Sequence, residues 1–163
     1  MTDCKIDEIK CISPNLGFDV DSNEEIVSVV GYAGVYGNKK MVEFLVERLS
    51  NFVNMSFDQK TILMHAVKHN NREVAELLIK HGSDINYKDE HGFTPLFYAV
   101  KNNNAKMVKL LIKNQAHVNI KDREGKALLF HIIDSGNVDI LKMCDKEVEY
   151  ACYYKIKKNF IVK

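Results

Sequence analysis

The feature that most constrains the fold of this chain is a repeat with a constant period. Three similar heptapeptides begin at the equally spaced positions Thr61, Thr94 and Ala127, and they read TILMHAV, TPLFYAV and ALLFHII. The period extends beyond them, because the LLI of residues 77–79 returns at residues 110–112. Equal steps of 33 residues are typical of a stack of similar units and are not typical of a globular enzyme fold.

A diverged copy precedes these three. Ala33 lies one period before Ala66 and two periods before Ala99, although the heptapeptide around it has changed. The apolar triplet FLV at residues 44–46 likewise lies one period before the LLI of the next copy. We therefore predict a first, diverged repeat over residues 22–54.

The repeats resemble the ankyrin repeat, whose family pattern runs DxxGxTPLHxAA, then a polar turn, then EIVxLLLxxGADVN. The residues that match this pattern in two of the copies are Asp89, Gly92, Thr94, Pro95, Leu96 and Ala99, and Glu73, Val74, Leu77, Leu78, Gly82, Asp84, Ile85 and Asn86. The likeness covers about residues 22–145. It implies an all-α ankyrin repeat solenoid of antiparallel helix pairs, with β-hairpin-like loops and terminal capping helices.

We expect one ankyrin repeat domain over residues 1–163. Isoleucines at three-residue spacing before Pro14 indicate a short amphipathic helix at the start, and Val148 and Cys152 belong to a helical pattern at the end. The expected parts are an N-terminal cap at 1–21, repeats at 22–54, 55–88, 89–121 and 122–145, and a C-terminal cap with a basic tail at 146–163. About four repeats exceed the minimum of roughly three that a stack needs.

Local signals support the helix pair in each copy. Thr94 is a good N-cap residue, and Pro95 suits the first helical position, where a missing N–H costs nothing. The polar stretch of residues 68–71 breaks the first helix, and Gly82 ends the second, as left-handed glycines usually do. Gln115 replaces that glycine one period later, so we expect a positive φ there at a cost of roughly 1 kcal/mol.

Two departures from the family pattern are visible. No copy keeps the histidine of TPLH, because its position holds Gly31, Met64, Phe97 and Phe130. The hydrogen bonds that this histidine organises in the family are therefore in doubt. The segment 54–61 is also shorter by one position than its counterpart in the next copy, so we expect the first hairpin to be irregular.

The composition fits one soluble domain of 163 residues with a net charge of +1. No apolar stretch is long enough to span a membrane, and the first residues lack the pattern of a secretory signal, so we expect a cytoplasmic protein, with the nucleus as the alternative. The small net charge removes the general attraction to nucleic acid, so no nucleic acid partner is expected. Lysine far outnumbers arginine and asparagine is abundant. Protozoan parasites, large DNA viruses and some intracellular bacteria share this bias, which suggests a host–pathogen setting.

No catalytic, cofactor or metal site is expected. The chain lacks Walker, GxGxxG, GxSxG and HExxH motifs. The four cysteines are Cys4, Cys11, Cys144 and Cys152. The spacings within the two pairs are helical-face spacings and not those of zinc sites. His65 and His69 lie one turn apart on one predicted helix, but no third ligand converges on them.

The resemblance implies that a partner protein is bound by the hairpin tips and by the exposed ends of the inner helices. The partner-binding residues predicted in this way are Tyr36, Phe57, Lys60, Lys68, His69, Glu90, His91, Phe93, Lys101, Asn102, Arg123 and Lys126. Phe93 follows Gly92 in a position that points away from the helical core, so it is a candidate anchor. The alternative is that Phe93 packs on a neighbouring hairpin through Phe57 or Lys126.

Four of these residues are lysines that would cluster on the same face and favour an acidic partner segment. They are Lys60, Lys68, Lys101 and Lys126. The alternative is that they are ordinary solubilising lysines.

Three functions are compatible with the sequence. The leading one is a non-catalytic protein–protein interaction module that acts as an adaptor or an inhibitor. A regulatory version resembles the short IκB-like ankyrin proteins of viruses, which inhibit host transcription factors. In the third, the chain is a substrate of an asparaginyl hydroxylase, because the segment ending at Asn86 resembles the asparagine motif that such an enzyme modifies.

Overall fold

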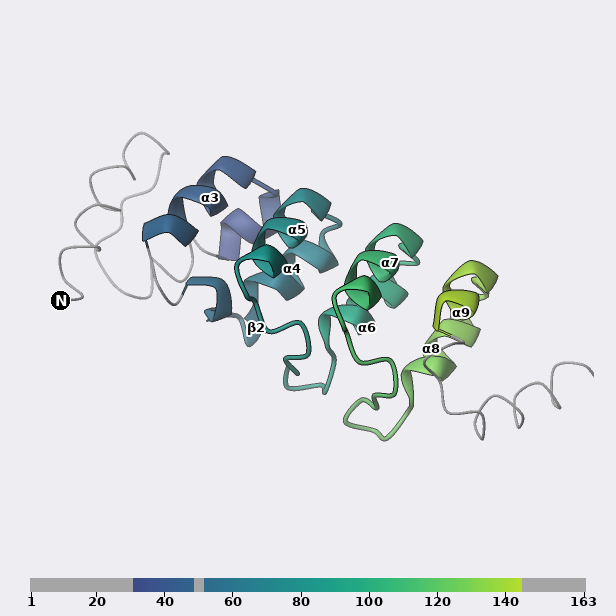
Figure 1. Cartoon of the computed structure of the whole chain (residues 1–163). Coiled ribbons are helices and arrows are strands. Elements are labelled where there is room, and N and C mark those ends of the chain that lie inside the picture. Colours follow the sequence, from purple (N-terminus) through teal and green to yellow (C-terminus); the bar gives the residue numbers. More distant parts are fainter. Residues whose placement is uncertain (1–30, 49–51, 145–163) are drawn as a thin grey trace, which may run out of the picture. The chain divides into compact units, whose positions relative to one another are not determined.

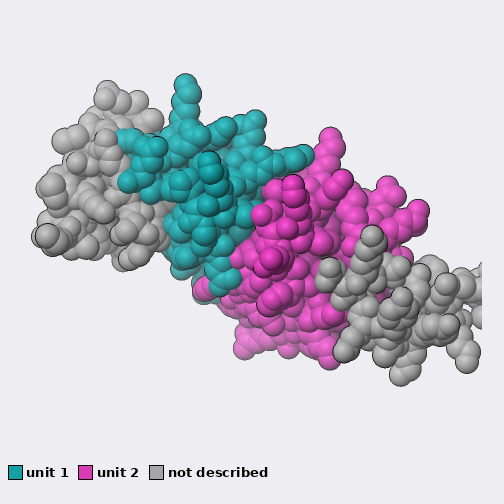
Figure 2. Space-filling model, in the orientation of Figure 1, with its two compact units in different colours: residues 1–84 teal, residues 85–163 magenta. Residues whose placement is uncertain are grey.

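A computed structural model describes residues 31–48 and 52–144, and these form pairs of short helices joined by loops (Figure 1). The chain divides into two compact units, residues 1–84 and residues 85–163 (Figure 2). Both predicted caps lie outside the described residues, and so does the start of the first predicted repeat. Among the helices that are described, none has the length and apolarity that crossing a bilayer requires.

In the first unit a helical segment over residues 31–36 precedes one long helix, a hairpin and a helix pair. The elements are α3 (Lys39–Arg48), η1 (Phe52–Asn54), β1 (Ser56–Phe57), β2 (Lys60–Thr61), α4 (Ile62–Lys68) and α5 (Arg72–Lys80). α5 packs against both α4 and α3. Leu45, Ala66 and Leu78 are buried at these contacts, which is consistent with the apolar faces that the repeat pattern predicts.

In the second unit two helix pairs follow one another. They are α6 (Pro95–Lys101) with α7 (Ala105–Lys113), and α8 (Leu128–Ser135) with α9 (Val138–Cys144). The inner helices α6 and α8 pack together, and so do the outer helices α7 and α9. Phe97, Leu111 and Leu128 are fully buried between them. The helix pairs confirm the predicted all-α solenoid of repeats.

The inner helices begin where the sequence predicts, but their caps differ. Thr61 and Thr94 are both extended residues at the N-cap position, and Pro95 occupies the first turn of α6. The side chain of Thr61 accepts a hydrogen bond from the amide of Met64 at 3.3 Å. The hydroxyl of Thr94 is buried and has no partner. The position of the second cap is therefore confirmed, whereas its hydrogen bond is missing.

Left-handed residues recur with the repeat at the ends of helices. Gly82 follows α5 with a φ of 85°, and Gln115 follows α7 with a φ of 66°. The predicted positive φ of Gln115 is thus confirmed. The turns between paired helices also contain one left-handed residue in each period, namely Gly37, Asn70, Asn103 and Gly136. Glycine and asparagine adopt this conformation at the lowest cost.

The prediction of an irregular first hairpin is wrong. β1 and β2 form an antiparallel ladder in which Phe57 pairs with Lys60 across a two-residue turn. The turn residues Asp58 and Gln59 have φ values of 50° and 59°, which is the type I′ geometry that suits a twisted hairpin. Gln59 stands one period before Gly92 and adopts the same left-handed conformation. The shorter segment closes tightly because these two side chains tolerate a positive φ.

At three of the four positions of the family histidine, apolar atoms occupy the space of its side chain. Met64 and Phe97 are fully buried. A Cβ on Gly31 would lie only 2.2 Å from a ring carbon of Phe57, so the aromatic ring occupies that space. Phe130 differs from the others because its side chain is exposed.

The residue after the histidine position makes the hydrogen bond to the preceding loop instead. Three side chains one period apart do this: His65 bonds the carbonyl oxygen of Phe57, Tyr98 bonds the carboxylate of Asp89, and His131 bonds the carboxylate of Asp122. The donor–acceptor distances are 2.8, 2.5 and 3.0 Å. The loop-to-helix bonds that the sequence put in doubt are therefore present in these three copies, one residue later in each.

Candidate functional site

An aspartate shapes the loop tip before α6. One carboxylate oxygen of Asp89 accepts hydrogen bonds from the amides of His91 and Phe93, both at 2.9 Å. The amide of Gly92 also donates to the carbonyl of Asp89 at 2.9 Å. Asp89 is buried, so its carboxylate accepts these bonds in a partly water-excluded site, where a hydrogen bond is electrostatically stronger than in water. The tip therefore has a fixed conformation.

The tip before α8 repeats this design. A carboxylate oxygen of Asp122 accepts from the amides of Glu124 and Lys126 at 3.0 and 2.8 Å. The two tips are joined directly, because the amide of Arg123 donates to the carbonyl of His91 at 2.9 Å. The second unit thus presents a connected pair of ordered tips.

Phe93 lies in a group of aromatic rings at this edge of the second unit. Its ring stacks on Phe97 with 5.1 Å between centroids, and it meets Tyr98 and His131 edge-on at 5.9 and 6.2 Å. The side chain is consequently half-buried. The expectation that Phe93 points away from the helical core is corrected, because Phe97 at the histidine position offers an apolar ring on which it stacks.

One cation lies over this group. The Nζ atom of Lys101 is 4.5 Å from the centroid of the Phe93 ring, within the range of a cation–π interaction. Lys101 itself is exposed, as are His91 and Arg123 at the tips. We call Phe93, Lys101, His91 and Arg123 the tip surface of the second unit.

Two of the four predicted lysines do not present a free charge. Lys60 is only 8% exposed, and its Nζ atom donates to the carbonyl oxygen of Asp58 at 3.2 Å. Its prediction as a partner contact is therefore corrected: the tight hairpin turns the side chain back onto its own loop. Lys126 donates to the carboxylate of Asp134 at 2.7 Å. This hydrogen bond raises the pKa of Lys126 and lowers that of Asp134.

The remaining predicted residues divide between the two units. In the first unit Tyr36, Lys68 and His69 are exposed and Phe57 is half-buried. In the second unit Glu90 and Asn102 are exposed beside the tip surface. Of the four lysines in the predicted acidic-binding cluster, Lys68 and Lys101 are exposed, and they belong to different units.

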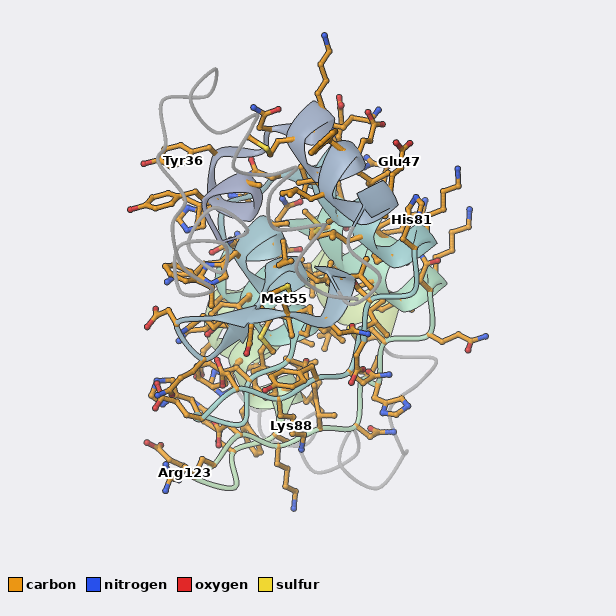
Figure 3. The ribbon with its side chains drawn as sticks, turned by 90° about the vertical axis from the view of Figure 1, so that its left-hand side faces the viewer. Tyr36, Glu47, Met55, His81, Lys88 and Arg123 are labelled. Carbon is orange, nitrogen blue, oxygen red and sulfur yellow. The ribbon has the colours of Figure 1, made fainter. Side chains whose placement is uncertain are left out.

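A second aromatic group lies in the first unit. Tyr36 is 75% exposed and extends away from the ribbon (Figure 3), with its ring stacked on Tyr32 at 5.7 Å. Tyr32 is followed by Phe57 at 6.3 Å and Phe57 by His65 at 5.5 Å. This row joins the helical segment at residues 31–36 to the hairpin and α4.

Tyr32, Tyr98 and His131 are not among the site residues that the sequence predicts. A signal for them exists, because Tyr32, His65, Tyr98 and His131 follow one another at intervals of one repeat period. Each of these four ring side chains directly follows the TPLH histidine position in the sequence. In each case at least one loop or aromatic side chain contacts the ring.

The hydrogen bonds of His65 and His131 affect the pKa values of His65 and Asp122. Burial lowers the pKa of His65, although the bond to the Phe57 carbonyl opposes this shift. The Nδ1 atom of His65 is buried without a partner, so a second proton on the ring would have no acceptor. Burial would raise the pKa of Asp122, but the hydrogen bonds from His131 and from the amides of Lys126 and Glu124 outweigh it and lower that pKa.

Asn86 uses both atoms of its amide in local bonds. Its oxygen accepts from the amide of His117 at 2.8 Å, and its nitrogen donates to the carbonyl of Gln115 at 3.4 Å. The residue borders a hollow of about 560 Å³ that Ile85 and Asn114 also line. The side chain therefore fastens one loop to the next.

Within the described residues no three histidine, cysteine or carboxylate side chains are grouped so that they could hold a metal ion. His65 uses Nε2 for the Phe57 carbonyl, which corresponds to a structural role. Cys144 is buried, and burial raises the pKa of its thiol to about 11. The other three cysteines lie outside the described residues.

Comparisons with known families agree with the repeat architecture. A model described as ankyrin repeats (3 copies) matches residues 5–89, and a model described as ankyrin repeats (many copies) matches residues 78–132. The two matches together extend from residue 5 to residue 132. A search among curated proteins found no match to the chain.

Proposed function

Because this chain belongs to the ankyrin repeat family, whose domains are generally protein–protein interaction modules, we propose that it is a non-catalytic adaptor or inhibitor. It binds a partner protein through the tip surface of its second unit, in the cytosol or the nucleus. The observation that carries this proposal is the half-buried Phe93 ring under the Lys101 cation. Phenylalanine is enriched in the cores of protein interfaces, and arginine, which Arg123 supplies at the neighbouring tip, is enriched among binding hot spots.

The chemistry of the tip surface indicates the partner's character. Phe93 offers the uncovered part of an apolar ring, Lys101 offers a positive charge over that ring, and Arg123 offers a second positive charge at the next tip. A partner segment with an apolar side chain and a neighbouring carboxylate would satisfy both. Glu90 at the rim would repel a segment with carboxylates on that side, so the position of the acid within the segment decides the fit.

The hydrogen bonds of the tips favour binding as well. Asp89 and Asp122 hold their loops through backbone amides, and the Arg123 amide joins the two loops. Loops that are ordered before a partner arrives lose little conformational entropy on association. The tip surface is therefore suited to recognise a partner without rearrangement.

The proposal is tested by affinity capture from cell lysate with mass spectrometry. The test variant is Lys101→Ala/Arg123→Ala, and the matched control is Lys88→Ala/Lys121→Ala, which removes two exposed charges of the same unit outside the tip surface. Circular dichroism checks that both variants keep their helicity. Partners that are lost with the test variant and kept with the control support the tip surface, whereas equal retention by both refutes it.

A regulatory form of the proposal is an IκB-like inhibitor whose partner is a host transcription factor. In this form the wild-type chain lowers the DNA binding of the captured factor in a gel-shift assay, and the Lys101→Ala/Arg123→Ala variant does so less. If neither the wild type nor the variant changes the gel shift, the inhibitor form is refuted and only the adaptor form of the proposal remains.

The hydroxylase alternative concerns Asn86. Both of its amide atoms are bonded to the loop around Gln115 and His117, so an enzyme would have to open these bonds to reach the side chain. A mass increase of one oxygen on Asn86 in native material would support this function. Unmodified Asn86 would argue against it.

A further inference from the structure

The outer helices of the second unit enclose a shallow groove between α7 and α9. Its volume is about 500 Å³. The lining residues are Lys109, Ile112, Lys113, Asp139, Lys142 and Met143. The groove lies on the outer helices, whereas the tip surface is built from the loops and the inner helix α6.

The groove combines an apolar floor with a positive rim. Ile112 and Met143 are half-buried, while Lys109, Lys113 and Lys142 are exposed. Within the described part of the chain none of these three lysines takes part in an ion pair. Among the described residues of the lining, Asp139 is the one acidic side chain.

The positive charge on α7 is not required by the fold. α5 occupies the same place one period earlier, and it carries Glu73 and Glu76 where α7 carries Lys106 and Lys109. All four of these side chains are exposed. Glu76 on α5 is neutralised within its own helix by Arg72 at 2.7 Å.

The buried positions of the two helices correspond throughout. Val74 and Leu78 of α5 are buried, and so are Met107 and Leu111 of α7. A helix with this buried face therefore folds with acids or with lysines on its exposed face. The uniform positive charge of α7 is thus a property of its surface and not of its packing.

We propose that the groove between α7 and α9 binds an acidic amphipathic helix of a partner protein. An apolar side chain of that helix fills the space over Ile112 and Met143, and its carboxylates face Lys109, Lys113 and Lys142. The apolar floor selects such a helix over nucleic acid, because the floor carries neither an aromatic ring for base stacking nor a hydrogen-bond donor for a phosphate. This second surface is independent of the proposed binding at the tips.

The test uses a defined probe with the full chain. A fluorescein-labelled peptide of about 15 residues, long enough for a helix with stabilised ends, carries leucines at i and i+4 and glutamates on both flanks. A second peptide has the same composition in an order that abolishes the amphipathic face. Fluorescence anisotropy measures both affinities at low and at physiological salt.

The decisive variant is Lys109→Glu/Lys142→Glu, and the matched control is Lys88→Glu/Lys121→Glu, which changes the net charge equally at exposed loop positions. Lys109→Glu introduces the residue type that α5 already carries at the equivalent position, so folding is expected to be kept, and circular dichroism checks this. We expect the groove variant to bind the ordered peptide roughly tenfold more weakly, as loss of complementary charge predicts. The control should bind as the wild type does.

Amide shift mapping with ¹⁵N-labelled protein locates the peptide. Perturbations centred on Lys109, Ile112 and Lys142 support the proposal. Perturbations centred on Phe93 and Lys101, equal weakening by both variants, or equal binding of the two peptides would overturn it. Failure of the wild type to bind the ordered peptide, or equal binding of a single-stranded oligonucleotide of the same charge, would overturn it too.

Discussion

The hydroxyl of Tyr98 donates a hydrogen bond of 2.5 Å to the carboxylate of Asp89, which precedes it in the loop before α6. The other oxygen of that carboxylate accepts from the amides of His91 and Phe93. One buried aspartate therefore links the inner helix α6 to the conformation of the tip. The orientation of Phe93, which carries the proposed function, depends on this link.

Tyr98→Phe tests that link. The change removes the donor and leaves a buried carboxylate oxygen without it, so we expect unfolding free energy to fall by about 1–3 kcal/mol. Urea unfolding followed by circular dichroism measures the loss. Tyr87→Phe is the control, because Tyr87 is 38% exposed and should change stability by less than about 0.5 kcal/mol. Equal effects of the two substitutions would contradict the role given to the Tyr98 hydroxyl.

The protonation of His65 should make stability depend on pH. Burial lowers its pKa in the folded chain below the value of 6.5, so the unfolded chain binds the proton more readily. The stability that His65 provides is complete above about pH 6.5 and declines as pH falls through that value toward the lower folded pKa. The charges of Lys60, Lys68 and His69 repel the imidazolium form of His65 and so lower its pKa further.

His65→Gln isolates this effect, because an amide can donate to the Phe57 carbonyl and does not titrate. Between about pH 7.5 and about pH 5.5, on either side of the ordinary imidazole pKa, the wild type should lose more stability than the variant does. His81→Gln is the control, since His81 is exposed and is not among the groups that shift the pKa of His65, so its replacement should keep the wild-type slope. Parallel pH profiles of wild type and His65→Gln would rule the explanation out.

Gln115→Gly should stabilise the chain by up to about 1 kcal/mol, because the φ of Gln115 is 66°, a conformation in which a Cβ is strained and glycine is not. The converse change, Gly82→Ala, should destabilise by a similar amount, because nothing lies within 4 Å of the added Cβ and only the backbone at a φ of 85° is strained. Melting temperatures of both variants check the pair. A lower melting temperature for Gln115→Gly would refute the prediction.

The two threonine caps should respond differently to valine. Thr61→Val removes the acceptor of the Met64 amide, so we expect a loss of about 1 kcal/mol. Thr94→Val replaces a buried hydroxyl that has no partner, so stability should stay the same or rise. Chemical unfolding of both single variants gives the comparison. A larger loss at Thr94 than at Thr61 would show that the Thr94 hydroxyl has a partner in solution.

Local conformational demands could be predicted from the sequence because they are expressed in single residues. Pro95 identifies the first turn of α6, and Gly82 the end of α5. Gln115 could be assigned a positive φ because the period places it where Gly82 stands. The hairpin could not be predicted in this way, since Asp58 and Gln59 adopt left-handed conformations without glycine.

The site was predicted less well, because exposure depends on neighbours that the sequence does not identify. The sequence predicts Lys60 to be an exposed charge, but its side chain folds back and donates to the carbonyl of Asp58. Phe93 looked like a free anchor but stacks on Phe97 and meets His131, which belongs to the next inner helix, α8. Whether the tip surface binds a partner stays a prediction.

The architecture follows from the order of the residues alone, since a constant repeat period with proline, glycine and asparagine at fixed places sets the sign of φ and the length of each helix. The working surfaces, in contrast, depend on tertiary packing. Tyr98 reaches Asp89, and Lys101 lies over Phe93, because packing brings together side chains from different elements. The physical reason is that backbone conformation is governed mainly by each residue and its neighbours in sequence, whereas burial and pairing are governed by neighbours in space.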